Sequence, residues 1–128
     1  MTYCISKTVR LPFDEAVDRV GEALASEGFG VLSDIDIKET INKKLGLDFR
    51  RYRILGACNP PMAHRALELE DRIGTMLPCN VVVQERPDGR VEVSAIDPVA
   101  AMAVIENPQL QELASAVRKK LGAAITAL

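Results

Sequence analysis

The sequence predicts one α+β domain over residues 1–128, with helices packed on one face of a single antiparallel or mixed sheet of four to five strands. Several segments alternate apolar and polar residues, which is typical of strands with one buried face. The segments between them repeat apolar residues at helical spacing. Asp88-Gly89, inside "RPDGR", marks a hairpin turn, and a hairpin requires antiparallel neighbours. The order is β-α-β-(α)-β-α-β-β-α, and helices on one face of such a sheet form an α+β layer architecture.

Length and composition indicate an ordinary globular protein. The chain has 128 residues, 48% of them apolar and 27% charged, which suits one domain with a hydrophobic core. A net charge of −2 gives no general attraction to nucleic acid or to an anionic membrane. The apolar stretches are too short to span a bilayer, and the N-terminus alternates instead of forming the apolar block of a signal peptide. Three cysteines without a close pair favour a reducing compartment, so we expect a cytoplasmic protein.

The first half of the chain alternates between strand and helix patterns. We expect a strand over 3–11, a helix from Pro12 to Gly28, a strand over 31–37 and a short helix over 38–45 that ends at Gly46. Lys7 is the one residue of the first strand that breaks the apolar side. In the second strand, the alternation predicts that Ile35 and Ile37 point inward and that Asp34 and Asp36 point outward.

The second half contains the clearest helix starts. We expect a strand over 49–57, a helix capped by Asn59 that ends at Pro78, strands over 79–84 and 91–95, a short helix up to Ile105, and a last helix capped by Asn107. The buried face of the Asn59 helix is predicted at Ala63, Ala66, Leu67 and Ile73. The apolar face of the last helix consists of Leu110, Leu113, Ala114, Val117, Leu121 and Ile125.

The second face of the sheet is predicted to be polar. It would carry Ser6, Thr8, Asp34, Asp36, Gln84 and Glu92. These side chains do not suit a second core layer, so this face is expected to meet water or a partner.

Four sequence features together resemble the domain-of-unknown-function family 302. They are "ILGACNP" followed by an Ala-rich helix, "LPCNVVVQE", the Asp-Gly hairpin, and a strand that ends in "DP". The resemblance covers essentially the whole chain, and the two cysteine-bearing segments are its most specific part. It implies an α+β fold related to the TATA-binding-protein-like arrangement, usually as a homodimer, and it implies no established reaction.

Cys58 has two interpretations. It lies just before a predicted helix N-terminus, where unpaired amides and the helix dipole favour a thiolate, and His64 lies early in the same helix. Cys58 and His64 are therefore the candidate catalytic residues of a thiol-dependent protein. In the other interpretation, Cys58 is a small apolar residue in a tight turn, as the neighbouring Gly56 and Ala57 suggest.

Neither a disulfide nor a metal site is predicted. A helix over residues 61–76 would hold Cys58 and Cys79 roughly 24 Å apart, whereas a disulfide needs Cα atoms within about 7 Å. Cys4, Cys58 and His64 are the candidate metal ligands, because the first strand could begin near the end of the third. They lack the regular spacing of zinc ligands, so we expect no metal and no cofactor.

Arg50, Arg51 and Arg53 form the main basic cluster, with two lysines upstream. Such a cluster either protects an edge strand or binds an anion, and Arg51, Arg53, Cys58 and Asn59 are the predicted ligand-binding residues. Nucleic acid is not an expected partner, because the chain is net acidic and poor in aromatic residues. No glycine-rich phosphate loop and no serine in a nucleophile-elbow context is found in the sequence.

Three functions follow as hypotheses. The first is a homodimer that binds a small anionic ligand in a pocket between sheet and helices, without contact to membranes. The second is a redox or nucleophilic protein that uses Cys58. The third is a protein-interaction module that works through its sheet face. Self-association is expected because an open sheet leaves edges that symmetric pairing can bury.

Overall fold

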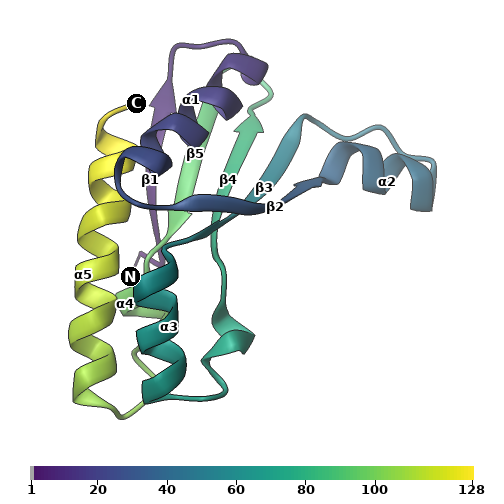
Figure 1. The fold of residues 1–128 in the computed structure, drawn as a ribbon. Helices are drawn as coiled ribbons and strands as arrows, with labels where there is room; N and C mark the ends of the chain where they lie inside the picture. The colour runs from purple at the N-terminus through teal and green to yellow at the C-terminus, as the bar shows by residue number, and fades with distance from the viewer. Residues whose placement is uncertain (1) are drawn as a thin grey trace.

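A five-stranded antiparallel sheet organises the computed structural model, which describes residues 2–128 (Figure 1). The strands are β1 (Cys4–Val9), β2 (Gly30–Asp36), β3 (Tyr52–Cys58), β4 (Cys79–Glu85) and β5 (Val91–Ile96). Their spatial order is β1-β5-β4-β3-β2, and every neighbouring pair is antiparallel. The predicted α+β fold is confirmed, and β1 and β2 form the two edges of the sheet.

Five helices and one 3-10 turn complete the described chain. They are α1 (Phe13–Ser26), α2 (Ile37–Leu45), α3 (Pro60–Leu69), η1 (Ile73–Met76), α4 (Pro98–Met102) and α5 (Pro108–Thr126). The predicted caps at Asn59 and Asn107 are confirmed, because each side chain accepts a hydrogen bond from an amide of the first helical turn. Within residues 2–128, no helix is long and apolar enough to span a membrane.

The hydrophobic core consists of two clusters. The larger one joins the inner face of the sheet to α1 and to the C-terminal half of α5, with Leu24, Val83, Val93 and Leu121 among its most buried members. The smaller one lies between α3, η1, α4 and the N-terminal half of α5. Its buried residues are Ala66, Ile73, Met102, Leu110 and Ala114.

Lys7, which interrupts the apolar side of β1, caps the C-terminus of α5. Its Nζ donates to the carbonyl oxygens of Thr126, at 3.0 Å, and of Leu128. Arg19 of α1 donates to the carbonyl of Ala127 at 3.1 Å. The last carbonyls of a helix lack intrahelical donors and form the negative end of its dipole, so two cations are favourable there.

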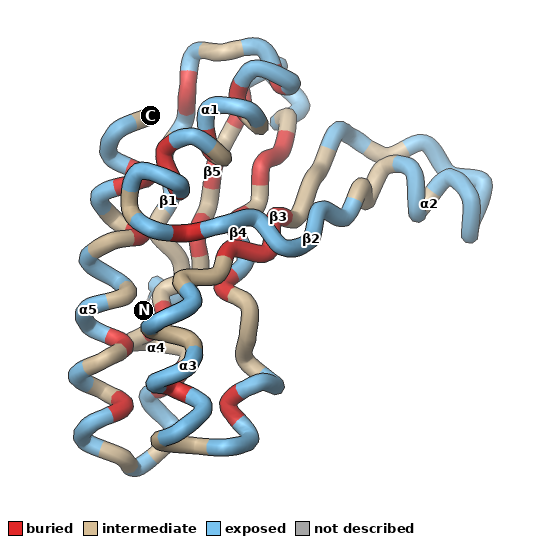
Figure 2. The backbone as a smooth tube through the Cα atoms, viewed as in Figure 1, coloured by how far each residue is buried: buried red, intermediate tan, exposed pale blue. Residues whose placement is uncertain are grey.

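Residues 33–52, here called the arm, extend away from the rest of the molecule and carry α2 at their far end (Figure 1). Figure 2 shows this region without the buried segments that run through the body. None of the residues of α2 is buried, and Leu45 and Leu47 are 67% and 57% exposed. The strand predicted over residues 31–37 is present as β2, but none of its residues is buried, because β2 is an edge strand that leaves the core.

The predicted sides of β2 are also reversed. Asp34 pairs with Leu55, which is buried under the helices, whereas Ile35 pairs with Ile54 on the uncovered face. The cause is a β-bulge between Val31 and Ser33, because one extra residue exchanges the two faces of a strand. Asp34 and Asp36 therefore lie on the helix side of the sheet.

The uncovered face of the sheet carries a polar row, as predicted for Ser6, Gln84 and Glu92. Ser6 Oγ lies 2.7 Å from Ser94 Oγ, and Gln84 Nε2 donates to Glu92 Oε1 at 3.4 Å. Gln84 is only 8% exposed and also accepts from Arg50 Nε at 3.1 Å. Beside this polar row, the register places Ile35, Ile54 and Val82 on adjacent strands.

The helix after Asn59 is shorter than predicted. α3 ends at Leu69 and the chain returns through η1, so Pro78 follows a loop and not the helix. The side chain of Asn107 donates to the carbonyl of Leu69 at 3.2 Å and satisfies one group at this helix end. Ala66 and Ile73 are buried as predicted, whereas Leu67 is 43% exposed.

The apolar face of α5 is confirmed, with an unequal distribution of burial. Leu110 and Leu121 are fully buried, whereas Leu113 and Val117 are half-buried. We therefore expect Leu121→Ala to lower the free energy of unfolding by about 2–5 kcal/mol. Leu113→Ala should cost less, because its side chain has fewer packed neighbours to lose. Urea denaturation of both variants measures the difference, and an equal loss would show that Leu113 is as well packed as Leu121.

Candidate functional site

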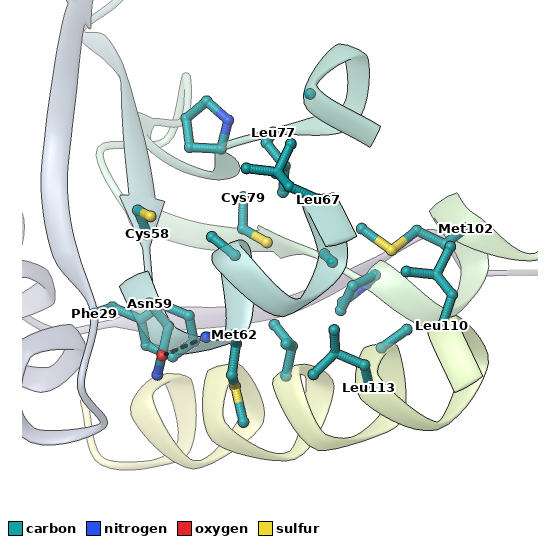
Figure 3. Close-up of a pocket in the computed structure, with 18 of the residues that line it drawn as sticks. Phe29, Cys58, Asn59, Met62, Leu67, Leu77, Cys79, Met102, Leu110 and Leu113 are labelled. Carbon is teal, nitrogen blue, oxygen red and sulfur yellow. Dashed lines mark hydrogen bonds between the residues drawn. The ribbon is translucent and has the colours of Figure 1, made fainter. Parts of the chain in front are cut away.

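An apolar cavity of about 320 Å³ lies between α3, α5 and η1 and the adjoining ends of β3 and β4 (Figure 3). α3 and η1 form one wall, α5 and α4 form another, and the sheet closes the third side. The lining residues are Phe29, Leu32, Ala57, Cys58, Asn59, Met62, Ala63, Ala66, Leu67, Gly74, Leu77, Pro78, Cys79, Pro98, Met102, Leu110, Leu113, Ala114 and Val117.

The lining is uncharged throughout the described residues. Its one amide side chain is Asn59, whose Oδ1 already accepts from the amide of Met62 at 3.4 Å. Carbon and sulfur atoms make up most of the remaining lining. The side chains of Cys79 and Met102 point into the cavity (Figure 3). Such a surface offers dispersion contacts and gives almost no compensation to a buried charge.

Small residues on three elements explain why the space is hollow. α3 contributes Ala63 and Ala66, η1 contributes Gly74, and α5 contributes Ala114. The cavity also lies between the two hydrophobic clusters. Phe29, Ala57 and Cys79 belong to the larger cluster, whereas Ala66, Met102 and Leu110 belong to the smaller one. A molecule in the cavity would therefore contact both clusters at once.

Cys58 and Cys79 are neighbours, in contrast to the predicted separation of roughly 24 Å, which assumed a straight helix. Ala57 pairs directly with Cys79 across β3 and β4, so Cys58 lies one residue from the partner of Cys79. Adjacent strands are only about 4.8 Å apart. The prediction is wrong because α3 ends early and the chain turns back, which returns both ends of the connection to the same edge of the cavity.

Burial dominates the chemistry of Cys79. Cys79 is only 7% exposed. Its burial, together with the nearby Cys58, raises the pKa of the Cys79 thiol to about 11. The neutral thiol therefore predominates at physiological pH, and Cys79 behaves as a small apolar residue.

The first turn of α3 has no spare amide among its described residues. Pro60 and Pro61 carry no N–H, and the amides of Met62 and Ala63 donate to the side chain and the carbonyl of Asn59. The unpaired amides that would favour a Cys58 thiolate, or a bound anion, are thus missing at this helix end. The geometry favours the structural interpretation of Cys58.

His64 does not approach the cavity. Its side chain is 77% exposed and its Nδ1 lies 3.9 Å from Glu68 Oε1, one turn further along α3. Cys4 lies on β1, and β5 and β4 separate that strand from β3. Three strand spacings amount to about 14 Å. Within residues 2–128, no three His, Cys, Asp or Glu side chains are grouped to hold a metal ion, and the candidate ligands Cys4, Cys58 and His64 are not brought together.

Arg51 and Arg53 lie at the opposite end of β3 from Cys58 and Asn59. Cys58 follows Arg53 by five positions, which corresponds to about 17 Å along a strand. Arg53 Nε donates to Asp34 Oδ1 at 2.7 Å, and this hydrogen bond lowers the pKa of Asp34. The guanidinium of Arg51 lies 5.8 Å from the centre of the Phe13 ring. The four predicted ligand-binding residues therefore belong to two separate places.

The arginine end of β3 forms a small hollow of about 130 Å³. Arg51, Arg53 and Lys38 line it together with two acidic residues, Asp14 and Asp36. Lys38 is already bound to Asp48 at 2.9 Å. The acidic side chains offset most of the positive charge that an anion would need.

Sequence reasoning did not identify most of the cavity wall. Met62, Leu67, Met102 and Leu113 look like ordinary core residues in a helical pattern. The available signal was a pair of small residues, Ala63 and Ala66, where a filled core would need larger side chains. That signal has meaning only when the facing elements are known.

We expect Cys79 to react with iodoacetamide far more slowly than Cys58 in the native protein at pH 8. With a pKa of about 11, only about one Cys79 in a thousand is a thiolate at that pH. Its rate should rise nearly tenfold per pH unit up to pH 10. Peptide mass spectrometry measures the rate of alkylation at each cysteine, and Cys4 serves as the internal reference. Equal rates for Cys58 and Cys79 at pH 8 would contradict the buried, neutral state of Cys79.

Comparison with known proteins supplies a family and a fold. Residues 5–128 match the family model described as "Domain of unknown function DUF302". A crystal structure of an uncharacterized conserved DUF302 protein from Bacillus stearothermophilus is similar at 31% identity, with a TM-score of 0.92 and 98% of each chain covered. The comparison with curated proteins finds no match.

Proposed function

Because the chain belongs to the DUF302 family, whose description assigns no activity, we propose from its cavity that this protein binds a small, neutral, apolar molecule. A volume of about 320 Å³ is near the lower end of the usual range for ligand pockets. The uncharged lining carries the proposal. It favours a compact apolar ligand of a few rings or a short chain.

The lining supports a neutral ligand better than an anionic one. An anion in this cavity would lose its hydration and find neither a cationic side chain nor a free helix amide among the lining residues. The anionic ligand predicted from Arg51 and Arg53 remains a separate prediction for the hollow at the other end of β3.

Binding would also stabilise the protein. A ligand in the cavity would add dispersion contacts to both hydrophobic clusters, because residues of both line it. Since the unfolded chain has no such cavity, ligand occupancy would raise the free energy of unfolding by mass action.

Two dyes with one ring skeleton test the charge preference. N-phenyl-1-naphthylamine is neutral, and its 8-sulfonate analogue has the same rings with one added anionic sulfonate group. We expect the neutral dye to bind at least about tenfold more tightly, because the sulfonate would be buried without a partner. Fluorescence titration measures the dissociation constant of each dye. Tighter binding of the sulfonate, lost in Arg51→Ala, would instead support the anionic site.

Cavity-filling variants locate the bound dye. Ala66→Leu should occupy the cavity and abolish the fluorescence increase with the neutral dye, and Ala63→Leu provides a second variant if the first disturbs folding. Ala116→Leu is the matched control, because Ala116 is exposed on α5 and does not line the cavity. Unchanged dye binding in folded Ala66→Leu and Ala63→Leu would exclude the cavity as the binding site.

We also propose that two copies of the chain associate through the arm. Helices as short as α2 are marginal in water, and α2, described in full, has no buried residue to stabilise it. Leu45, Leu47 and Ile35 are exposed residues of the arm. Ile35 pairs with Ile54, and Ile54 pairs with Val82, so these three residues form an apolar row on the uncovered face of the sheet. A two-fold pair would bury each arm on its partner and cover an edge strand.

Sedimentation equilibrium should give the mass of a dimer at high micromolar concentration. Leu45→Glu and Leu47→Glu should each shift the protein to a monomer, because they place a charge in the proposed interface. Val104→Glu is the control, since Val104 is 79% exposed and lies after α4, outside the arm. A wild-type monomer at high micromolar concentration would refute self-association.

A further inference from the structure

Leu32 belongs both to the wall of the cavity and to the base of the arm. In the described register, Val31 pairs with Ala57 and Ser33 pairs with Gly56, so Leu32 is the extra residue of the β-bulge. It is 70% exposed, and it is nevertheless one of the residues that line the cavity. A bulge redirects one side chain and bends its strand, and bulges are frequent beside binding sites.

A second contact links the arm to the cavity through Gly56. A Cβ atom at Gly56 would lie 2.7 Å from Pro78 Cγ and would collide with Ser33 Oγ. Ser33 is the first residue of the arm, and Pro78 lines the cavity. Glycine therefore permits the base of the arm to pack closely against a wall of the cavity.

We infer that occupancy of the cavity is coupled to the order of the arm through Leu32, an inference that rests on the proposed function. A ligand that contacts Leu32 and Pro78 holds the bulge in one conformation. The paired residues directly beyond the bulge, Ser33–Asp36 on β2, then open less often. The coupling is reciprocal, so an arm held in place also favours ligand binding.

Three features make Leu32 the coupling residue. It is unpaired, and its neighbours on either side are hydrogen-bonded into the sheet, so its side chain can move without breaking the ladder. It is the one cavity residue contributed by β2. The arm beyond it has no buried helix to fix its position. A small change at Leu32 therefore acts on a segment with little stability of its own.

Hydrogen exchange with mass spectrometry tests the coupling. The background is Leu45→Glu, so that self-association does not contribute to protection, and the ligand is saturating N-phenyl-1-naphthylamine. We expect the dye to slow exchange in residues 33–36 by fivefold or more. Leu32→Ala, which removes part of the cavity lining, should lower the affinity for the dye, and at a dye concentration that saturates this variant the slowing should be abolished. Leu47→Ala, which shortens another exposed arm residue outside the cavity, should keep the slowing.

Dye fluorescence, recorded on the same samples, separates the possible failures. Dye that binds without slowing exchange in residues 33–36 would overturn the coupling and leave the proposed function intact. Full slowing in Leu32→Ala would overturn the role of Leu32. Absence of dye binding in the Leu45→Glu background, which leaves the cavity lining unchanged, would overturn the proposed function and the coupling together.

Discussion

The pairing of β3 with β4 is the constraint on which the rest of the structure depends. Its register places Ala57 opposite Cys79 and so closes a connection that contains α3 and η1 into a loop with adjacent ends. The loop must fold back over α5, and it presents alanine and glycine to the space it encloses. The cavity is the consequence, because these small side chains cannot fill the gap between the two hydrophobic clusters.

β3 also divides the chemistry of the molecule between its two ends. At its first end Arg53 donates to Asp34, and Arg50 and Arg51, which precede β3 in the arm, lie against aromatic rings. Its last residues carry Cys58 and lead into Asn59 at the apolar cavity. Charge and apolar surface are therefore separated along one strand. This separation favours a neutral ligand at one end and leaves the other end to the arm.

Cys58 illustrates how a local motif depends on its surroundings. A cysteine before a helix N-terminus is a favourable place for a thiolate when the helix offers free amides. Here two prolines remove two amides, and Asn59 engages the next two. The segment works as a firmly capped turn, and Cys58 contributes a sulfur atom to the wall of the cavity.

The sequence by itself determined the fold class, the helix starts at Asn59 and Asn107, the hairpin at Asp88-Gly89 and the apolar face of α5. These features depend on neighbours within a few residues, where periodicity and capping act directly. Only the tertiary structure decided the bulge at Leu32, which reverses the sides of Asp34 and Ile35, and the approach of Cys79 to Cys58. It also decided the role of Lys7 as a cap for α5 and the existence of the cavity. These features depend on contacts between residues far apart in the chain. Packing of the whole fold sets the strand register that brings such residues together, and the local sequence pattern does not contain this information.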